Sequence, residues 1–69
     1  MYRRIFTAED TILMNRLFSY GYKDYVIAKD MKAMEKEIYL YRWITWGNRT
    51  PKGIYKFCVE NNILPEIIS

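Results

Sequence analysis

The sequence predicts an all-α protein, a compact bundle of three to four short helices that contains a helix-turn-helix. Apolar residues recur at three- and four-residue spacing, which is typical of amphipathic helices. Threonine caps at Thr7 and Thr50, with glycines at Gly21 and Gly47, divide these stretches as helix starts and stops do. No linker interrupts the 69 residues, and 51% of them are hydrophobic. We therefore expect residues 1–69 to fold as one domain around one core.

The first helix is expected to start after Thr7, because Thr7 and Asp10 have the spacing of a capping box. It should end at Gly21, a residue that favours helix C-termini. Its predicted apolar stripe consists of Leu13, Leu17 and Tyr20, widened by Met14 and Phe18.

A short second helix, from Tyr25 to about Met31, is expected to be capped by Asp24 and to turn Ile27, Ala28 and Met31 inward. A third helix is predicted over residues 34–46. Its aromatic and β-branched content would also suit a strand. We prefer a helix because the sequence contains no partner strand.

The fourth helix is expected to be capped by Thr50, with Pro51 at its first position, where the missing N–H is harmless. It should run to about Asn62, and Leu64-Pro65 should close the structure. Its predicted inner face is formed by Ile54, Phe57 and Cys58, and its outer face carries Lys52 and Lys56.

Catalytic, metal and cofactor chemistry finds little support in this composition. The chain has no histidine, and a single cysteine, Cys58, cannot build a zinc site. No glycine-rich phosphate loop is present. We therefore predict a protein that is not an enzyme and that needs no metal or cofactor.

A cytoplasmic location is predicted from the cysteine content and the hydropathy. One cysteine cannot form the internal disulfides that small secreted domains normally need. The N-terminal residues lack the apolar run of a signal peptide, and no segment approaches the roughly 20 apolar residues that span a bilayer. Membrane contact is therefore not expected.

The charge is distributed unevenly. The net charge is +3, and residues 38–59 contain four cations and no Asp or Glu. Such a stretch suits a polyanion, although a solvated protein face has the same composition.

The first half of the chain resembles a known family. The residues concerned are Phe6-Thr7-Ala8-Glu9-Asp10, then Gly21, then Asp24 to Met31 with Ile27-Ala28 at its centre. This pattern resembles the opening of homeodomain-like or Myb-like helix-turn-helix proteins, including small ones from phages and mobile elements. The resemblance implies double-stranded DNA as partner and a role as a transcriptional regulator or accessory factor. Small Ala28 suits the close crossing of two helices.

The resemblance and the apolar pattern disagree about Ile38. The family's register implies a recognition helix after Met31, with Ile38 packed inward and Tyr41 supporting it. At about 100° per residue, however, the apolar face would consist of Tyr39, Leu40, Trp43 and Ile44, with Ile38 opposite. Lys32-Ala33 also departs from the family, which usually places Gly in this turn.

A second segment resembles the turn and recognition helix of the same family. It runs from Trp46 to Phe57 and includes Gly47-Asn48-Arg49-Thr50-Pro51, and Ile63-Leu64 matches apolar residues that follow that helix. On this interpretation, residues between Met31 and Gly47 are an insertion. The predicted DNA-binding residues are Arg42, Arg49, Thr50, Lys52, Tyr55 and Lys56, of which Arg can bind guanine or phosphate and Lys phosphate. Both the third and the fourth helix are thus candidates for recognition.

The aromatic residues suggest an alternative. The chain has more aromatic side chains than so small a core can bury, namely seven Tyr, three Phe and two Trp. The third helix would then dock on a host protein, as a small inhibitor or adaptor does, through Tyr39, Trp43 and Trp46. The third expectation combines both functions: a homodimer forms through the aromatic third helix and reads DNA with the fourth helix.

Overall fold

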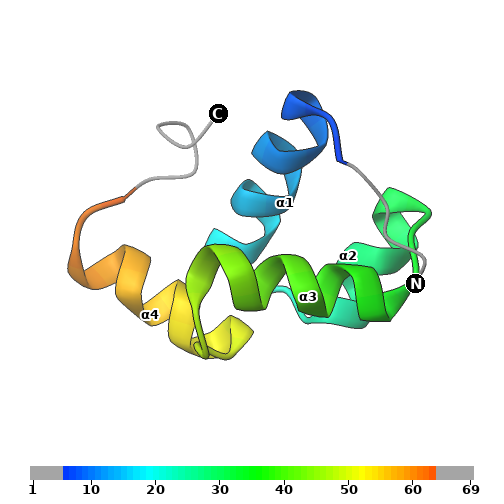
Figure 1. Ribbon diagram of the computed structural model, residues 1–69. Helices are drawn as coiled ribbons and strands as arrows, with labels where there is room; N and C mark the ends of the chain where they lie inside the picture. Colours follow the sequence, from blue (N-terminus) through cyan, green and yellow to red (C-terminus); the bar gives the residue numbers. More distant parts are fainter. Residues whose placement is uncertain (1–5, 64–69) are drawn as a thin grey trace.

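The computed structural model describes residues 6–63 and confirms the all-α prediction, with four helices and no strand in that range. The helices are α1 (Ala8–Ser19), α2 (Asp24–Met31), α3 (Glu35–Trp46) and α4 (Pro51–Glu60). Figure 1 shows α3 crossing in front of α1, with α2 towards one end of α3 and α4 beyond the other. Helix α2 packs on α3, and α1 contacts both α4 and α2. The predicted close at Leu64-Pro65 lies outside the described residues.

The core draws on all four helices. Its buried side chains are Met14, Phe18, Ile27, Ala28, Met31, Ile38, Ile54 and Cys58. The ring of Tyr41 stacks on Phe18, with 6.4 Å between centroids, and Phe6 meets it edge-on. The expected stripe of α1 is shifted, because Met14 and Phe18 are fully buried whereas Leu13 and Tyr20 are 38% and 55% exposed. Helices α2 and α4, which contact α1, contribute side chains to the same core in which Met14 and Phe18 are buried.

The sequence correctly predicted two helix starts. The Asp10 N–H donates to the Thr7 hydroxyl and the Thr7 N–H to the Asp10 carboxylate, both at 3.1 Å, which completes a capping box. At α4, the Gly53 N–H donates to the Thr50 hydroxyl at 3.1 Å, and Pro51 is the first helical residue. These caps succeed as predictions because they involve residues only three apart.

The start of α2 was predicted wrongly. Asp24 is the first residue of the helix, and Lys23 occupies the cap position without a side-chain hydrogen bond. The Asp24 carboxylate instead accepts two hydrogen bonds from Arg42 of α3. A partner eighteen residues away has therefore replaced the local cap.

Three helices end in the same way, with a left-handed residue after the last turn. These residues are Gly21, Lys32 and Asn62, with φ of 86°, 54° and 55°. In each case the following N–H bonds back to a carbonyl five residues earlier, as from Tyr22 to Leu17 and from Ala33 to Ala28. The turn between α2 and α3 thus forms with Lys32, a residue other than Gly, in the left-handed conformation.

Gly21→Ala is expected to destabilise the protein. A left-handed backbone costs a non-glycine residue roughly 1–2 kcal/mol. A Cβ at Gly21 would also lie 3.2 Å from the Tyr55 Cβ, so α1 and α4 would have to separate slightly. The midpoint of urea denaturation measures this loss, with the exposed neighbour Tyr20→Ala as a control that stays within about 0.5 kcal/mol of wild type. An unchanged midpoint for Gly21→Ala would contradict the prediction.

The structure shows which side of α3 is buried. Ile38 is 0% exposed, as the family's register implied, and Tyr41 is half-buried. Tyr39, Leu40, Trp43 and Ile44, which the apolar pattern grouped as an inner face, are all exposed. Helix α3 therefore has apolar side chains on two faces, and only one of them is covered.

Candidate nucleic-acid interface

Helix α4 presents two of the predicted cations to solvent. Lys52 and Lys56 are four residues apart, so both project from one side of the helix, while Ile54 and Cys58 are buried on the other. The first turn of α4 contains no acidic residue. The positive end of the helix dipole and the two ammonium groups therefore all contribute positive electrostatic potential to this side of α4.

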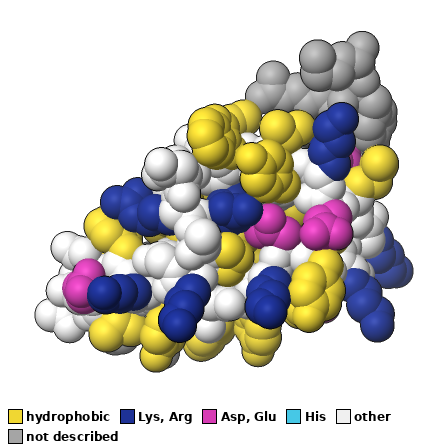
Figure 2. Space-filling model, turned by 90° about the horizontal axis from the view of Figure 1, so that it is seen from below, with side chains coloured by type: hydrophobic (Ala, Val, Ile, Leu, Met, Phe, Trp, Pro, Cys, Tyr) yellow, Lys and Arg dark blue, Asp and Glu magenta, His cyan; other side chains and the backbone are white. Residues whose placement is uncertain are grey.

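A third lysine, Lys23, joins them from the start of α2. An open hollow of about 390 Å³ lies where the N-terminal ends of α2 and α4 meet, and both Lys23 and Lys52 line it. Figure 2 shows a row of Lys and Arg side chains across the lower part of this view of the molecule. None of Lys23, Lys52 and Lys56 forms an ion pair with a residue in the described range 6–63. Sequence reasoning missed Lys23, because nothing local indicates that α2 and α4 start side by side.

Two carboxylates also line this hollow. Asp24 is neutralised by Arg42, with a 2.9 Å contact between their charged groups. Glu35, the first residue of α3, is exposed. The hollow is therefore cationic on its Lys23 and Lys52 side and keeps one acidic group, Glu35, without a described ion-pair partner.

Arg42, predicted as a phosphate contact, is used within the fold. Its Nε and one terminal nitrogen donate to the two Asp24 carboxylate oxygens, both at 2.9 Å. The other terminal nitrogen donates to the Arg49 carbonyl at 2.6 Å. The guanidinium thus ties α2, α3 and the turn before α4 together, which leaves few of its donors for DNA.

The remaining predicted residues differ in how free they are. Arg49 donates to the Trp46 carbonyl at 3.1 Å, and its guanidinium lies 4.4 Å from the centre of the Phe57 ring. The Thr50 hydroxyl is engaged in the α4 cap. Tyr55 is 49% exposed although its Cβ lies close to Gly21. The structure brings the predicted residues of α4 onto one surface, with Lys52, Lys56 and Tyr55 the most accessible.

The aromatic residues of the alternative site are separated. The Trp46 indole N–H donates to the Asn15 side-chain oxygen at 3.2 Å, and the Tyr41 hydroxyl donates to the same oxygen at 2.8 Å. Trp46 thus belongs to the contact between α3 and α1. Tyr39 and Trp43 point outward and are 45% and 53% exposed.

Among residues 6–63, two groups have shifted pKa values, and both shifts are explained by packing. Burial raises the pKa of the Tyr41 hydroxyl, more than its hydrogen bonds to Thr45 and Asn15 lower it. Burial also raises the pKa of the Cys58 thiol, which keeps it protonated and unreactive at neutral pH. Neither group has the environment of a reactive centre.

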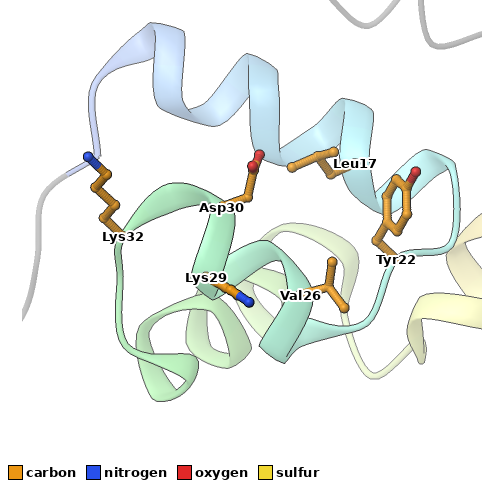
Figure 3. Close-up of a pocket in the computed structure, with 6 residues that line it drawn as sticks. All are labelled: Leu17, Tyr22, Val26, Lys29, Asp30 and Lys32. Atoms are coloured by element: carbon orange, nitrogen blue, oxygen red, sulfur yellow. The ribbon is translucent and has the colours of Figure 1, made fainter.

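A second open groove, of about 590 Å³, lies between α1 and α2. Figure 3 shows it, with Leu17 on α1, Tyr22 and Val26 at one end, and Lys29, Asp30 and Lys32 along α2 and the turn that follows it. Its charged residues are of both signs. The exposed side of α4 formed by Lys52, Tyr55 and Lys56, by contrast, carries no carboxylate among these residues.

Comparison of the chain with protein-family models, with curated proteins and with solved structures gives no match. None of the helices within residues 6–63 has the length and apolar character needed to cross a membrane.

Proposed function

We propose that this protein binds double-stranded DNA and acts by occupancy, as a small regulator or accessory factor without catalytic activity of its own. The observation that carries the proposal is the group of exposed lysines Lys23, at the start of α2, and Lys52 and Lys56, one turn apart on α4, none of which has a described ion-pair partner. Because DNA carries closely spaced phosphates, such a group gains affinity by releasing condensed counterions.

The supporting geometry favours α4 over α3 as the helix nearest the DNA. The exposed side of α4 carries Lys52, Tyr55 and Lys56, which offer ammonium and hydroxyl donors to phosphate. The outer side of α3 is dominated by apolar side chains that offer few hydrogen bonds to base edges. Arg49, at the turn before α4, is the candidate for a contact in the groove.

The test is a titration of duplex binding against salt. With three phosphate contacts, the slope of log K against log [salt] is expected to be about −3 or steeper. The double variant Lys52→Ala/Lys56→Ala should make that slope about 2 units shallower, because each lost phosphate contact removes about 1. Fluorescence anisotropy of a labelled duplex between about 50 and 200 mM salt measures both.

Lys29→Ala is the matched control, since it removes the same charge from the groove between α1 and α2. Lys29→Ala should make the salt slope shallower by much less than Lys52→Ala or Lys56→Ala alone does. Absent or salt-insensitive binding would refute the proposal. Equal effects from Lys29→Ala and Lys52→Ala would show that the attraction is diffuse and that this surface is not the site.

A further inference from the structure

Four exposed tyrosines lie around Gly21, in the turn between α1 and α2. They are Tyr20, Tyr22, Tyr25 and Tyr55, which are 55%, 47%, 59% and 49% exposed, and we call them the tyrosine cluster. Tyr20 and Tyr22 flank Gly21 in the sequence. Tyr55 reaches the same turn from α4, because a Cβ at Gly21 would lie 3.2 Å from the Tyr55 Cβ. Tyr25 lines the hollow that Gly21 also lines.

The rings of the tyrosine cluster are not stacked face to face on other rings. Tyr20 and Tyr22 meet edge to face, with 6.2 Å between ring centroids and 65° between ring planes. Within residues 6–63, Tyr25 and Tyr55 make no contact with another aromatic ring. The exposed ring faces are therefore available to a planar ligand.

The lysines of the candidate interface alternate with these rings. Lys23 directly follows Tyr22 in the sequence. On α4, Lys52 lies three residues before Tyr55, and Lys56 lies directly after it. Figure 2 shows hydrophobic side chains, a class that includes tyrosine there, next to Lys and Arg side chains across the lower part of the view.

Carboxylates lie at the edges of this surface. Asp24 is paired with Arg42 at 2.9 Å. Asp30 lines the separate groove between α1 and α2, where two lysines also lie. Glu60 is the last residue of α4. Glu35 alone brings to the hollow a carboxylate without a described ion-pair partner, so the three lysines leave the surface positive.

We propose that the tyrosine cluster binds an unpaired DNA strand, with bases stacked on its rings and phosphates beside Lys23, Lys52 and Lys56. Proteins hold single strands by combining aromatic rings with a positively charged path for the backbone. In a duplex the faces of the bases are stacked on one another, so rings at the protein surface reach them only in an unpaired strand. The inference goes beyond the duplex interface proposed above, because it adds the base faces as ligands while using the same lysines.

Two strands of equal charge test the role of the bases. They are an oligothymidine of about 12 nucleotides and an abasic strand of the same length. Oligothymidine should bind at least about tenfold more tightly, since only it has bases that stack on the rings. The slope of log K against log [salt] should be about −2 for both strands, because each of three phosphate contacts to a single strand contributes about 0.7. Fluorescence anisotropy of the labelled strands measures both quantities.

Tyr25→Ala removes the most exposed ring of the tyrosine cluster. It should lower the affinity for oligothymidine at least about fivefold, and it should leave the salt slope and the affinity for the abasic strand unchanged. Tyr25→Phe keeps the ring and should bind like the wild type. Tyr20→Ala tests a second ring in the same way. Far-UV circular dichroism and the midpoint of urea denaturation should match the wild type, because both side chains are more than half exposed.

Trp43→Ala is the matched control. Trp43 is an aromatic residue that is 53% exposed, but it lies on α3 and does not line the hollow. Its substitution should leave the affinity for oligothymidine at the wild-type value. Equal losses in Trp43→Ala and Tyr25→Ala would overturn the proposal, as would equal affinity of the wild type for oligothymidine and for the abasic strand.

A blunt duplex measured in parallel separates this proposal from the previous one. Binding of the duplex without binding of oligothymidine would overturn the single-strand site and leave the duplex interface standing. Binding of oligothymidine without binding of the duplex would refute the duplex interface and support the single-strand site.

Discussion

Replacing Ile38 by alanine is expected to cost about 2–5 kcal/mol of unfolding free energy, whereas Ile44→Ala stays within about 0.5 kcal/mol of wild type. The two residues are of the same type and lie six positions apart on α3. Ile38 is fully buried among the core side chains, and Ile44 is 65% exposed. The truncation therefore leaves a cavity at position 38 and only removes solvated surface at position 44.

Urea denaturation followed by circular dichroism measures both changes. A net stability of about 5 kcal/mol is typical of a domain this small, so Ile38→Ala is expected to be largely unfolded at moderate urea. If Ile44→Ala lowered the unfolding free energy more than Ile38→Ala, the buried face of α3 would be the one that its apolar pattern indicated. Equal losses would contradict the packing of α3 altogether.

Arg42→Ala is expected to cost about 2–3 kcal/mol of unfolding free energy. It removes two charge-assisted hydrogen bonds to Asp24 and one to the Arg49 carbonyl. The side chains of Arg42 and Asp24 are only 12% and 14% exposed, so the carboxylate left behind is poorly solvated. Arg42→Lys should recover little, because a lysine cannot form the two-pronged contact.

A double-mutant cycle isolates this contact. Asp24→Ala/Arg42→Ala should be more stable than the sum of the two single losses predicts, because no unpaired charge remains. Additive losses would show that the two residues act separately. The salt slope of DNA binding gives a second measure. Arg42→Ala should leave that slope unchanged in protein that is still folded, whereas a phosphate contact would reduce it by about 1.

The helix boundaries could be predicted closely because their signals are local. The Thr7 and Thr50 caps and the Gly21 stop act over three to five residues, and the structure reproduces each of them. The buried side of α4 followed from its spacing for the same reason. The helix ends predicted less well are those where a distant group intervenes, as Arg42 does at Asp24.

The candidate site was predicted in part. The spacing of Lys52 and Lys56 places them together on α4, and both are exposed. Lys23 was not predicted, since its place beside Lys52 depends on how α2 and α4 pack. In the sequence, nothing local distinguishes Arg42 from the other basic residues in a stretch without acidic residues. Its ion-pair partner, Asp24, is brought to it by the packing of α2 on α3.

The sequence by itself determined that this protein is helical, where the helices with local caps start and stop, and which residues carry its charge, because caps, spacing and composition are properties of neighbouring residues. The tertiary structure decided which of the two apolar sides of α3 is covered. Local periodicity favoured the side of Ile44, whereas the helices that pack against α3 bury the side of Ile38. The tertiary structure also decided which cations are held by interactions within the protein, as Arg42 is, and which are exposed and available to a partner.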